Sequence, residues 1–159
     1  MGKTVEAEEL FKQALCIKTN KMGPDDLENA VTLYELGRCA RAERRLVKAE
    51  KCLRQALKIV EANLGPNDLQ VAWTLQELGR CVRQAGRLGE AEELLKRALR
   101  IQEAKLGPNH ASIPWTLYDL ARCVGKSEPE KQIGDIVNRV DDLLKFLQRR
   151  MKEYRRSTI

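Results

Sequence analysis

The sequence is poor in aromatic residues and has no long apolar run. Phe, Trp and Tyr together make up 4% of the 159 residues, so a hydrophobic core must be built from Leu, Ala, Val and Ile. No apolar stretch approaches the roughly 20 residues that a membrane-spanning helix requires. Residues 1–6 lack the apolar segment of a secretory signal peptide. The sequence therefore indicates neither a membrane span nor secretion, and we expect a cytoplasmic protein.

Residues that carry chemistry are also scarce. The chain has one histidine, His110, which lies in a Pro-Asn-His segment where a helix is expected to begin. A second histidine, a Gly-rich phosphate-binding loop and a cluster of metal-ligating residues are all missing from the sequence. We therefore predict that the protein is not an enzyme and that it binds neither a metal nor another cofactor.

The sequence does contain a repeat. The motif Leu-Gly-Arg-Cys, or Leu-Ala-Arg-Cys in its last copy, occurs at residues 36–39, 78–81 and 120–123. Gly-Pro pairs keep the same interval of 42 residues, at 23–24, 65–66 and 107–108. A fixed period of this length is typical of an array of stacked structural repeats. The sequence thus predicts a solenoid, and its helical periodicity makes the fold class all-α.

Hydrophobic periodicity divides the array into helices. We expect a half repeat at residues 5–20, two complete repeats at 26–63 and 68–105, and the first helix of a third at 111–125. Glycine suits the left-handed position after a helix and proline cannot continue one, so each Gly-Pro pair separates two repeats. Arg44 occupies the internal turn position that Gly86 holds in the second repeat. A positive φ there would cost arginine on the order of 1 kcal/mol.

The five cysteines do not suggest a disulfide framework. Cys39, Cys81 and Cys123 share one repeat position, so they should lie about one repeat apart. That separation exceeds the roughly 7 Å between Cα atoms that a disulfide tolerates. We expect all five, including Cys16 and Cys52, to be buried and reduced, as in other cytosolic proteins.

Small residues at fixed positions identify the kind of repeat. The first helix carries Leu-Gly and the second carries two alanines, at Leu36-Gly37, Ala49 and Ala56 and again at Leu78-Gly79, Ala91 and Ala98. This pattern resembles the tetratricopeptide repeat, in the longer form found in kinesin light chains and nephrocystin-like proteins. The resemblance covers about residues 5–125. It implies a right-handed superhelix whose concave face, lined by the first helix of each repeat, binds peptide segments of other proteins.

The resemblance also implies which side chains line the groove. Carried over to this chain, they are Val31, Tyr34, Arg38, Arg41, Trp73, Gln76, Arg80, Arg83, Trp115, Tyr118, Arg122 and Lys126. Aromatic rings beside guanidinium groups suit a peptide that carries carboxylates. Alternatively, the shared arginine of each repeat pairs with the acidic residue three positions before it, as on an ordinary solvated helix face. Those acidic residues are Glu35, Glu77 and Asp119.

Residues 127–159 leave the repeat pattern. We expect one long, basic, amphipathic helix from about residue 129 to 156, with apolar residues spaced four and three apart as in a coiled coil. The first of them are expected to cover the end of the third repeat: Ile133, Val137 and Val140. The others are expected to stay exposed: Leu144, Leu147, Met151 and Tyr154. Residues 145–159 contain six basic residues and one acidic residue, so most of the net charge of +6 lies in this helix.

The sequence therefore favours an adaptor that binds an acidic or amphipathic peptide segment of a partner protein in the groove. Two alternatives stay open. One is a homo-oligomer held together by the C-terminal helix, and the other is a basic helix that binds a membrane surface or calmodulin. Nucleic-acid binding has little support, because no recognition motif accompanies the positive charge.

Overall fold

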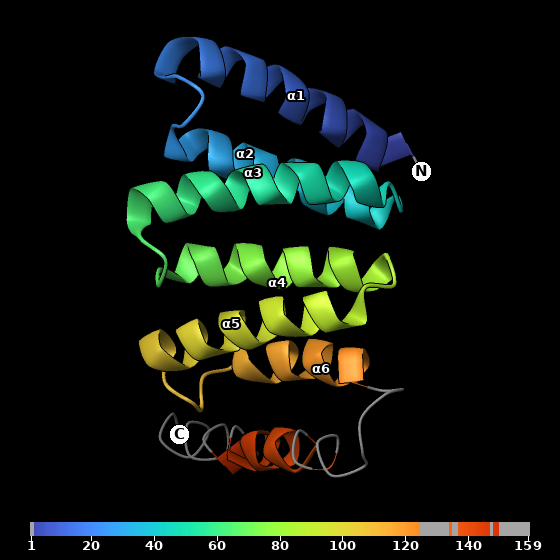
Figure 1. The fold of residues 1–159 in the computed structure, drawn as a ribbon, viewed down its shortest axis with the longest axis vertical. Coiled ribbons are helices and arrows are strands. Elements are labelled where there is room, and N and C mark those ends of the chain that lie inside the picture. The colour runs from blue at the N-terminus through green and yellow to red at the C-terminus, as the bar shows by residue number, and fades with distance from the viewer. Residues whose placement is uncertain (1, 125–133, 135–136, 147, 150–159) are drawn as a thin grey trace, which may run out of the picture.

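The chain folds into a stack of helices. The computed structural model describes residues 2–124, 134, 137–146 and 148–149. Its helices are α1 (Gly2–Met22), α2 (Leu27–Ala42), α3 (Leu46–Leu64), α4 (Leu69–Gln84), α5 (Leu88–Leu106) and α6 (Ile113–Val124). Residues 137–146 form a further helical segment, which we call the final helix. None of the described residues lies in a strand (Figure 1), so the predicted all-α fold class is confirmed.

Short polar segments end one helix and begin the next. The carboxylate of Asp26 accepts a hydrogen bond from the backbone N–H of Glu28 at 2.8 Å, and Asp68 caps α4 in the same way through Gln70. Such caps satisfy amide groups that have no partner within the helix. Gly65 ends α3 with a φ of 86°, a left-handed conformation that glycine adopts at little cost. The Gly-Pro boundaries of the sequence therefore coincide with helix ends.

Two glycines allow the helices of each complete repeat to pack closely. A Cβ atom added at Gly37 of α2 would lie 2.6 Å from Cγ of Leu53 in α3. One added at Gly79 of α4 would lie 2.8 Å from Cγ of Leu95 in α5. The alanines of the repeat pattern are completely buried: Ala49, Ala56, Ala91 and Ala98. Small side chains thus bring the two helix backbones together in both repeats.

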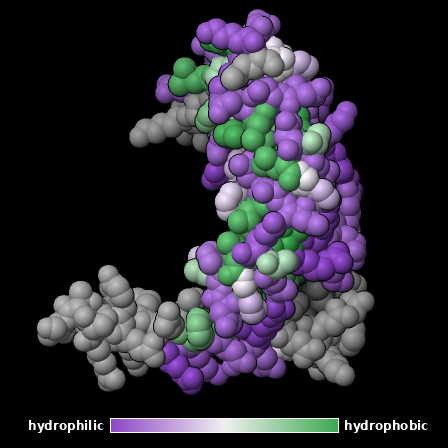
Figure 2. Space-filling view, turned by 90° about the vertical axis from the view of Figure 1, so that its left-hand side faces the viewer, coloured by the Kyte–Doolittle hydropathy of each residue, from purple (hydrophilic) through white to green (hydrophobic). Residues whose placement is uncertain are grey.

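The helix pairs stack in sequence order, and the stack is curved. Within the repeats α2 packs against α3 and α4 against α5, while α1, α3 and α5 each pack against the helix that follows (Figure 1). The backbones of α2 and α4, and of α4 and α6, also approach each other, whereas those of α3 and α5 do not. The first helices of the repeats therefore lie on the inner side of the curve. Figure 2 shows the hollowed side of the molecule at its left edge.

The final helix continues the stack in the register of a second helix. Arg139 pairs with Glu103 of α5. Forty-two residues earlier, Arg97 of α5 pairs with Glu61 of α3 at 2.7 Å. Leu143 is 4% exposed and packs in the same core as residues of α4, α5 and α6. The segment therefore takes the place that the period of 42 residues gives it.

The predicted division of apolar residues in the final helix is wrong in part. Val137 is 48% exposed, and Leu143 packs in the core beside the half-buried Val140 instead. In the period of 42 residues Leu143 corresponds to the buried Ile101, which explains its position. Leu144 is 46% exposed, as expected. The remaining residues of the predicted seam lie outside the described part of the chain: Ile133, Leu147, Met151 and Tyr154.

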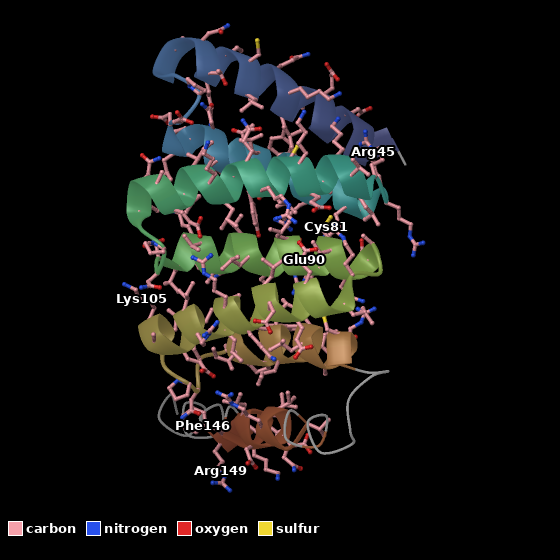
Figure 3. All side chains as sticks on the ribbon, viewed as in Figure 1. Arg45, Cys81, Glu90, Lys105, Phe146 and Arg149 are labelled. Carbon is pink, nitrogen blue, oxygen red and sulfur yellow. The ribbon has the colours of Figure 1, made fainter. Side chains whose placement is uncertain are left out.

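The cysteines are free thiols, but they are not all buried. Cys81 lies between α3 and α4, where its thiol donates to the carbonyl of Leu46 at 3.5 Å (Figure 3). Burial raises the pKa of the Cys81 thiol and of the equally buried Cys123 thiol. Cys16 is exposed and Cys39 and Cys52 are only partly buried, so the prediction of five buried thiols is wrong for these three. Among the described helices α1 packs only against α2, which leaves part of its surface in solvent.

Candidate functional site

The inner face of the stack contains two hollows that differ in chemistry. The first lies between α2 and α4 and has a volume of about 260 Å³. We call it the apolar hollow, and its lining is Ala30, Val31, Tyr34, Glu35, Val60, Gln70, Trp73 and Thr74. Val31 is 50% exposed and Trp73 46%. Two large apolar side chains are therefore accessible to a ligand at this place.

The second hollow lies between the C-terminal parts of α2 and α4 and helix α6, and has a volume of about 600 Å³. We call it the basic hollow, and its lining is Arg41, Arg44, Leu46, Arg80, Arg83, Gln84, Trp115, Tyr118, Asp119 and Arg122. Trp115 is 66% exposed and Tyr118 55%. The structure thus brings six of the predicted groove residues together around one space: Arg41, Arg80, Arg83, Trp115, Tyr118 and Arg122.

Two arginines of the basic hollow are held by internal carboxylates. Glu77 contacts Nη2 of Arg41 at 3.0 Å and Nη1 of Arg80 at 2.6 Å. Nε of Arg80 also donates to Asp119 of α6 at 2.5 Å. Burial lowers the pKa of the Arg80 guanidinium, but the charges of Asp119 and Glu77 outweigh this effect and raise that pKa overall. Arg80 therefore pairs with the acidic residue three positions before it, as the alternative interpretation of the sequence proposed.

Three other arginines of the basic hollow have no carboxylate partner among the described residues: Arg44, Arg83 and Arg122. Arg122 instead lies over the ring of Tyr118, with its guanidinium carbon 5.6 Å from the ring centre, a cation–π contact. Nε of Arg83 is buried without a hydrogen-bond partner in the described part of the chain. Arg44 has a φ of 60°. Because no described carboxylate pairs with these three guanidinium groups, they can interact with an anionic ligand.

Gln76 does not line the surface, contrary to the prediction. It is 9% exposed, and its Nε2 donates to Asp119 at 3.1 Å. Its Oε1 accepts a hydrogen bond from Gln102 of α5 at 3.3 Å, and Thr116 of α6 donates to Gln102 at 2.7 Å. Buried polar groups need such partners. The side chain of Gln76 therefore joins a polar network that links α4, α5 and α6 next to the basic hollow.

The sequence prediction did not include Arg44, Leu46 and Gln84 of the basic hollow's lining, nor Gln102 and Thr116 of the polar network. Two of them stood out in the repeat comparison, since Arg44 replaces Gly86 and Gln102 replaces the buried Val60 of the first repeat. Of the predicted groove residues, Arg38 lines neither hollow; it pairs with Glu35 at 3.1 Å. Lys126 lies outside the described residues.

Two other kinds of site are absent from the described part of the chain. No helix there combines the length and the apolar character needed to cross a membrane. No group of three or more His, Cys, Asp and Glu side chains in that part is placed to hold a metal ion.

Several solved structures share this fold. BtubC (BKLC) from P. vanneervenii gives a TM-score of 0.84 at 18% identity, over 92% of this chain and 59% of the BtubC chain. Two crystal structures of TPR-like repeats from Podosopora anserina, of a protein assigned as a kinesin light chain, give 0.76 and 0.74. Both are 24% identical and cover 93% of this chain and 70% of theirs. At these identities the likeness shows a shared fold.

The sequence itself matches a family model over most of its length. The model of the tetratricopeptide repeat matches residues 1–62, 35–104 and 83–130. None of the curated proteins compared with the chain matches it. From the family match and the shared fold, we conclude that the chain belongs to the tetratricopeptide repeat family.

Proposed function

We propose that the protein is an adaptor that binds a peptide segment of a partner protein along the inner face of the stack. One observation supports this most. The two hollows are lined from successive first helices, α2, α4 and α6, and expose large apolar and cationic side chains side by side. Concave faces of repeat arrays are common binding surfaces, and such combinations of side chains suit peptide recognition.

The apolar hollow suits a large apolar side chain of the peptide. Trp73 and Val31 are about half exposed there, so a ligand side chain would remove apolar surface on both molecules from water. Burying one such side chain contributes roughly 1.5–3 kcal/mol before ordering costs. This hollow would therefore hold the apolar anchor of the peptide.

The basic hollow suits an acidic group of the same peptide, since hydrogen bonds to charged groups contribute roughly 1.5–3 kcal/mol each. Trp73 and Arg83 are ten residues apart on α4, which is about 15 Å along a helix. An extended peptide covers that distance with about four or five residues. We therefore expect a ligand whose apolar and acidic residues are separated by about that many positions.

Selection from a degenerate peptide library tests this proposal. Selected peptides should combine a large apolar residue with an acidic one. Fluorescence anisotropy should then show that Trp73→Ala and Arg122→Glu each weaken binding about tenfold or more, the loss of about one good contact. Higher salt should weaken binding further. Arg122 is a better choice than Arg80, because Arg80 also holds Glu77 and Asp119 in place.

Lys58→Glu is the matched control. Lys58 is exposed on α3 and lines neither hollow. The variant changes the charge of the protein by the same amount as Arg122→Glu, so it corrects for long-range electrostatics. Selected peptides that bind both groove variants as tightly as the original protein would rule the groove out.

Self-association through the final helix is a second candidate. Val137 and Leu144 lie two turns apart on one face of the final helix and are 48% and 46% exposed, and clustered apolar side chains on a surface often mark an interface. If light scattering shows an oligomer, Val137→Glu with Leu144→Glu should reduce its mass at the same concentration. An unchanged mass would count against this interface.

Two further proposals from the sequence stand beside these. Binding of a membrane surface or calmodulin by the basic tail rests chiefly on residues 150–159, which lie outside the described part of the chain. A cytoplasmic location is supported by the free thiols, since reducing compartments keep cysteines in this form.

A further inference from the structure

The basic hollow carries more positive charge than one acidic side chain would neutralise. Five guanidinium groups line it, and the internal carboxylates pair with two of them, Arg41 and Arg80. Three stay without a carboxylate partner among the described residues: Arg44, Arg83 and Arg122. An occupant with a larger charge and more acceptor atoms than a carboxylate would fit this arrangement better.

The backbone conformation of Arg44 also points to a ligand at this place. Its φ of 60° lies in the left-handed region, where the equivalent Gly86 of the next repeat has 85°. An L-residue with a side chain is strained in this conformation. The Arg44 side chain makes no ion pair or hydrogen bond with a described residue, so no such interaction within the described part of the chain accounts for an arginine at this turn. Strained residues often occur at binding sites, and Arg44 lines the basic hollow.

The walls of the basic hollow include two exposed aromatic side chains. Trp115 and Tyr118 expose more than half of their surface there. Arg122 lies over the Tyr118 ring, so a cation and an aromatic face are presented together. Aromatic side chains favour contact with another flat ring, and the volume of about 600 Å³ leaves room for one.

We propose that the basic hollow binds a phosphorylated tyrosine side chain of the peptide ligand. A phosphate group carries a charge of about −1.5 to −2 at pH 7 and three strong acceptor oxygens, and the planar fork of arginine donates two parallel hydrogen bonds to it. The phenyl ring meets the walls formed by Trp115 and Tyr118. Arg83 lines the same hollow and supplies a further guanidinium group. This inference rests on the proposed function, which supplies the peptide.

The two tryptophans of the chain provide the test, because Trp73 lies in the apolar hollow and Trp115 in the basic hollow. The probes are phenyl phosphate, phenylacetate, O-phosphoserine and inorganic phosphate, and the readout is the indole N–H signal of each tryptophan in ¹H–¹⁵N NMR spectra. Phenyl phosphate should shift the Trp115 signal saturably and leave the Trp73 signal unchanged. The other three probes should require about tenfold higher concentrations.

Variants connect this signal to the arginines. Arg44→Gly should weaken phenyl phosphate binding about threefold, the usual size of one exposed charge contact. It restores the glycine of the second repeat, so we expect it to fold, and a circular dichroism melt checks this. Lys58→Ala is the control and should leave the binding unchanged. Equal affinity for phenylacetate and phenyl phosphate, or an Arg44→Gly variant that binds as tightly as the original protein, would overturn the proposal.

Two outcomes separate this inference from the proposed function. If library peptides without phosphate bind the groove while phenyl phosphate does not shift Trp115, the proposed function stands and the phosphotyrosine site is wrong. If phenyl phosphate binds but no library peptide does, tyrosine-phosphorylated or not, the peptide groove is wrong. Vesicles containing phosphoinositides that bind through Arg44 would assign the hollow to a lipid headgroup and would also overturn the proposal.

Discussion

Arg44 occupies a strained turn position beside the proposed binding site. The turn between α2 and α3 places it in the left-handed region, with a φ of 60°. The corresponding turn between α4 and α5 has Gly86, and a Cβ atom added there would meet no atom within 4 Å. The difference between the two turns is therefore one of backbone strain rather than of packing.

Replacing Arg44 with glycine should stabilise the protein. Removing the strain should raise the free energy of unfolding by on the order of 1 kcal/mol, measured by urea denaturation. The reverse exchange, Gly86→Arg, should lower it by a similar amount and serves as the matched control. A destabilised Arg44→Gly variant would mean that the arginine makes a contact in the folded protein that outweighs the strain.

Arg44 and Gln76 illustrate what could be predicted from the sequence and what could not. The strain at Arg44 was predictable, because comparison of the two turns reveals the missing glycine. The burial of Gln76 was not predictable. The same position is a tyrosine in the other two repeats, Tyr34 and Tyr118, and each of these lines one of the hollows. Gln76 turns inward because Gln102 stands where the first repeat has Val60 and offers it a buried partner. Such a partner is known only once the repeats are stacked.

At the scale of elements, the final helix carries two apolar patterns that overlap. Val137, Val140 and Leu144 follow a coiled-coil spacing, whereas Val140 and Leu143 follow the repeat register. The structure buries Leu143, half-buries Val140 and exposes Val137 and Leu144. The sequence predicted that this segment is helical and which residues are apolar. The coiled-coil spacing alone did not indicate the buried face, whereas the period of 42 residues does, because it aligns Leu143 with the buried Ile101.

The fit between two helices of a repeat can be tested at its glycine. In Gly37→Ala the new Cβ would lie 2.6 Å from Leu53 Cγ, so the Leu53 side chain or the two helices must shift. We expect the free energy of unfolding to fall by roughly 1–3 kcal/mol, as for other overpacked cores. Thermal or urea denaturation measures this change.

Gly89→Ala is the control for this experiment. Gly89 lies in the first turn of α5, and a Cβ atom added there would meet nothing within 4 Å. Alanine favours a helix over glycine by up to about 1 kcal/mol, so this variant should be stabilised or unchanged. If Gly37→Ala behaved like Gly89→Ala, the close approach of α2 and α3 would not limit the choice of residue.

At the scale of the whole molecule, the helices differ in how many neighbours hold them. Ile59 of α3 and Ile101 of α5 are 3% and 5% exposed, whereas Ile17 at the same repeat position in α1 is 58% exposed. Among the described helices α1 packs only against α2. The stability of repeat arrays is approximately a sum over units and the interfaces between neighbours. Stability should therefore be uneven along the stack.

Hydrogen exchange measured by mass spectrometry tests this expectation. Backbone amides of α1 should exchange fastest and those of α4, which packs against α3 and α5, slowest. The cause is the smaller apolar area that α1 buries. If α1 and α4 exchanged at the same slow rate, the stack would open as one cooperative unit, and the neighbour-by-neighbour account would not apply.

The constant spacing of the junctions has a consequence for inheritance. Leu-Gly-Pro-Asn occurs at 64–67 and again at 106–109, and the pairs Glu61–Arg97 and Glu103–Arg139 join consecutive second helices. A gene segment that encodes residues 65–106 can therefore be duplicated in frame, because the copy begins and ends at the same junction and brings its own half of each ion pair. Each such duplication would extend the inner face by one unit, so the length of ligand that it spans can evolve in whole steps.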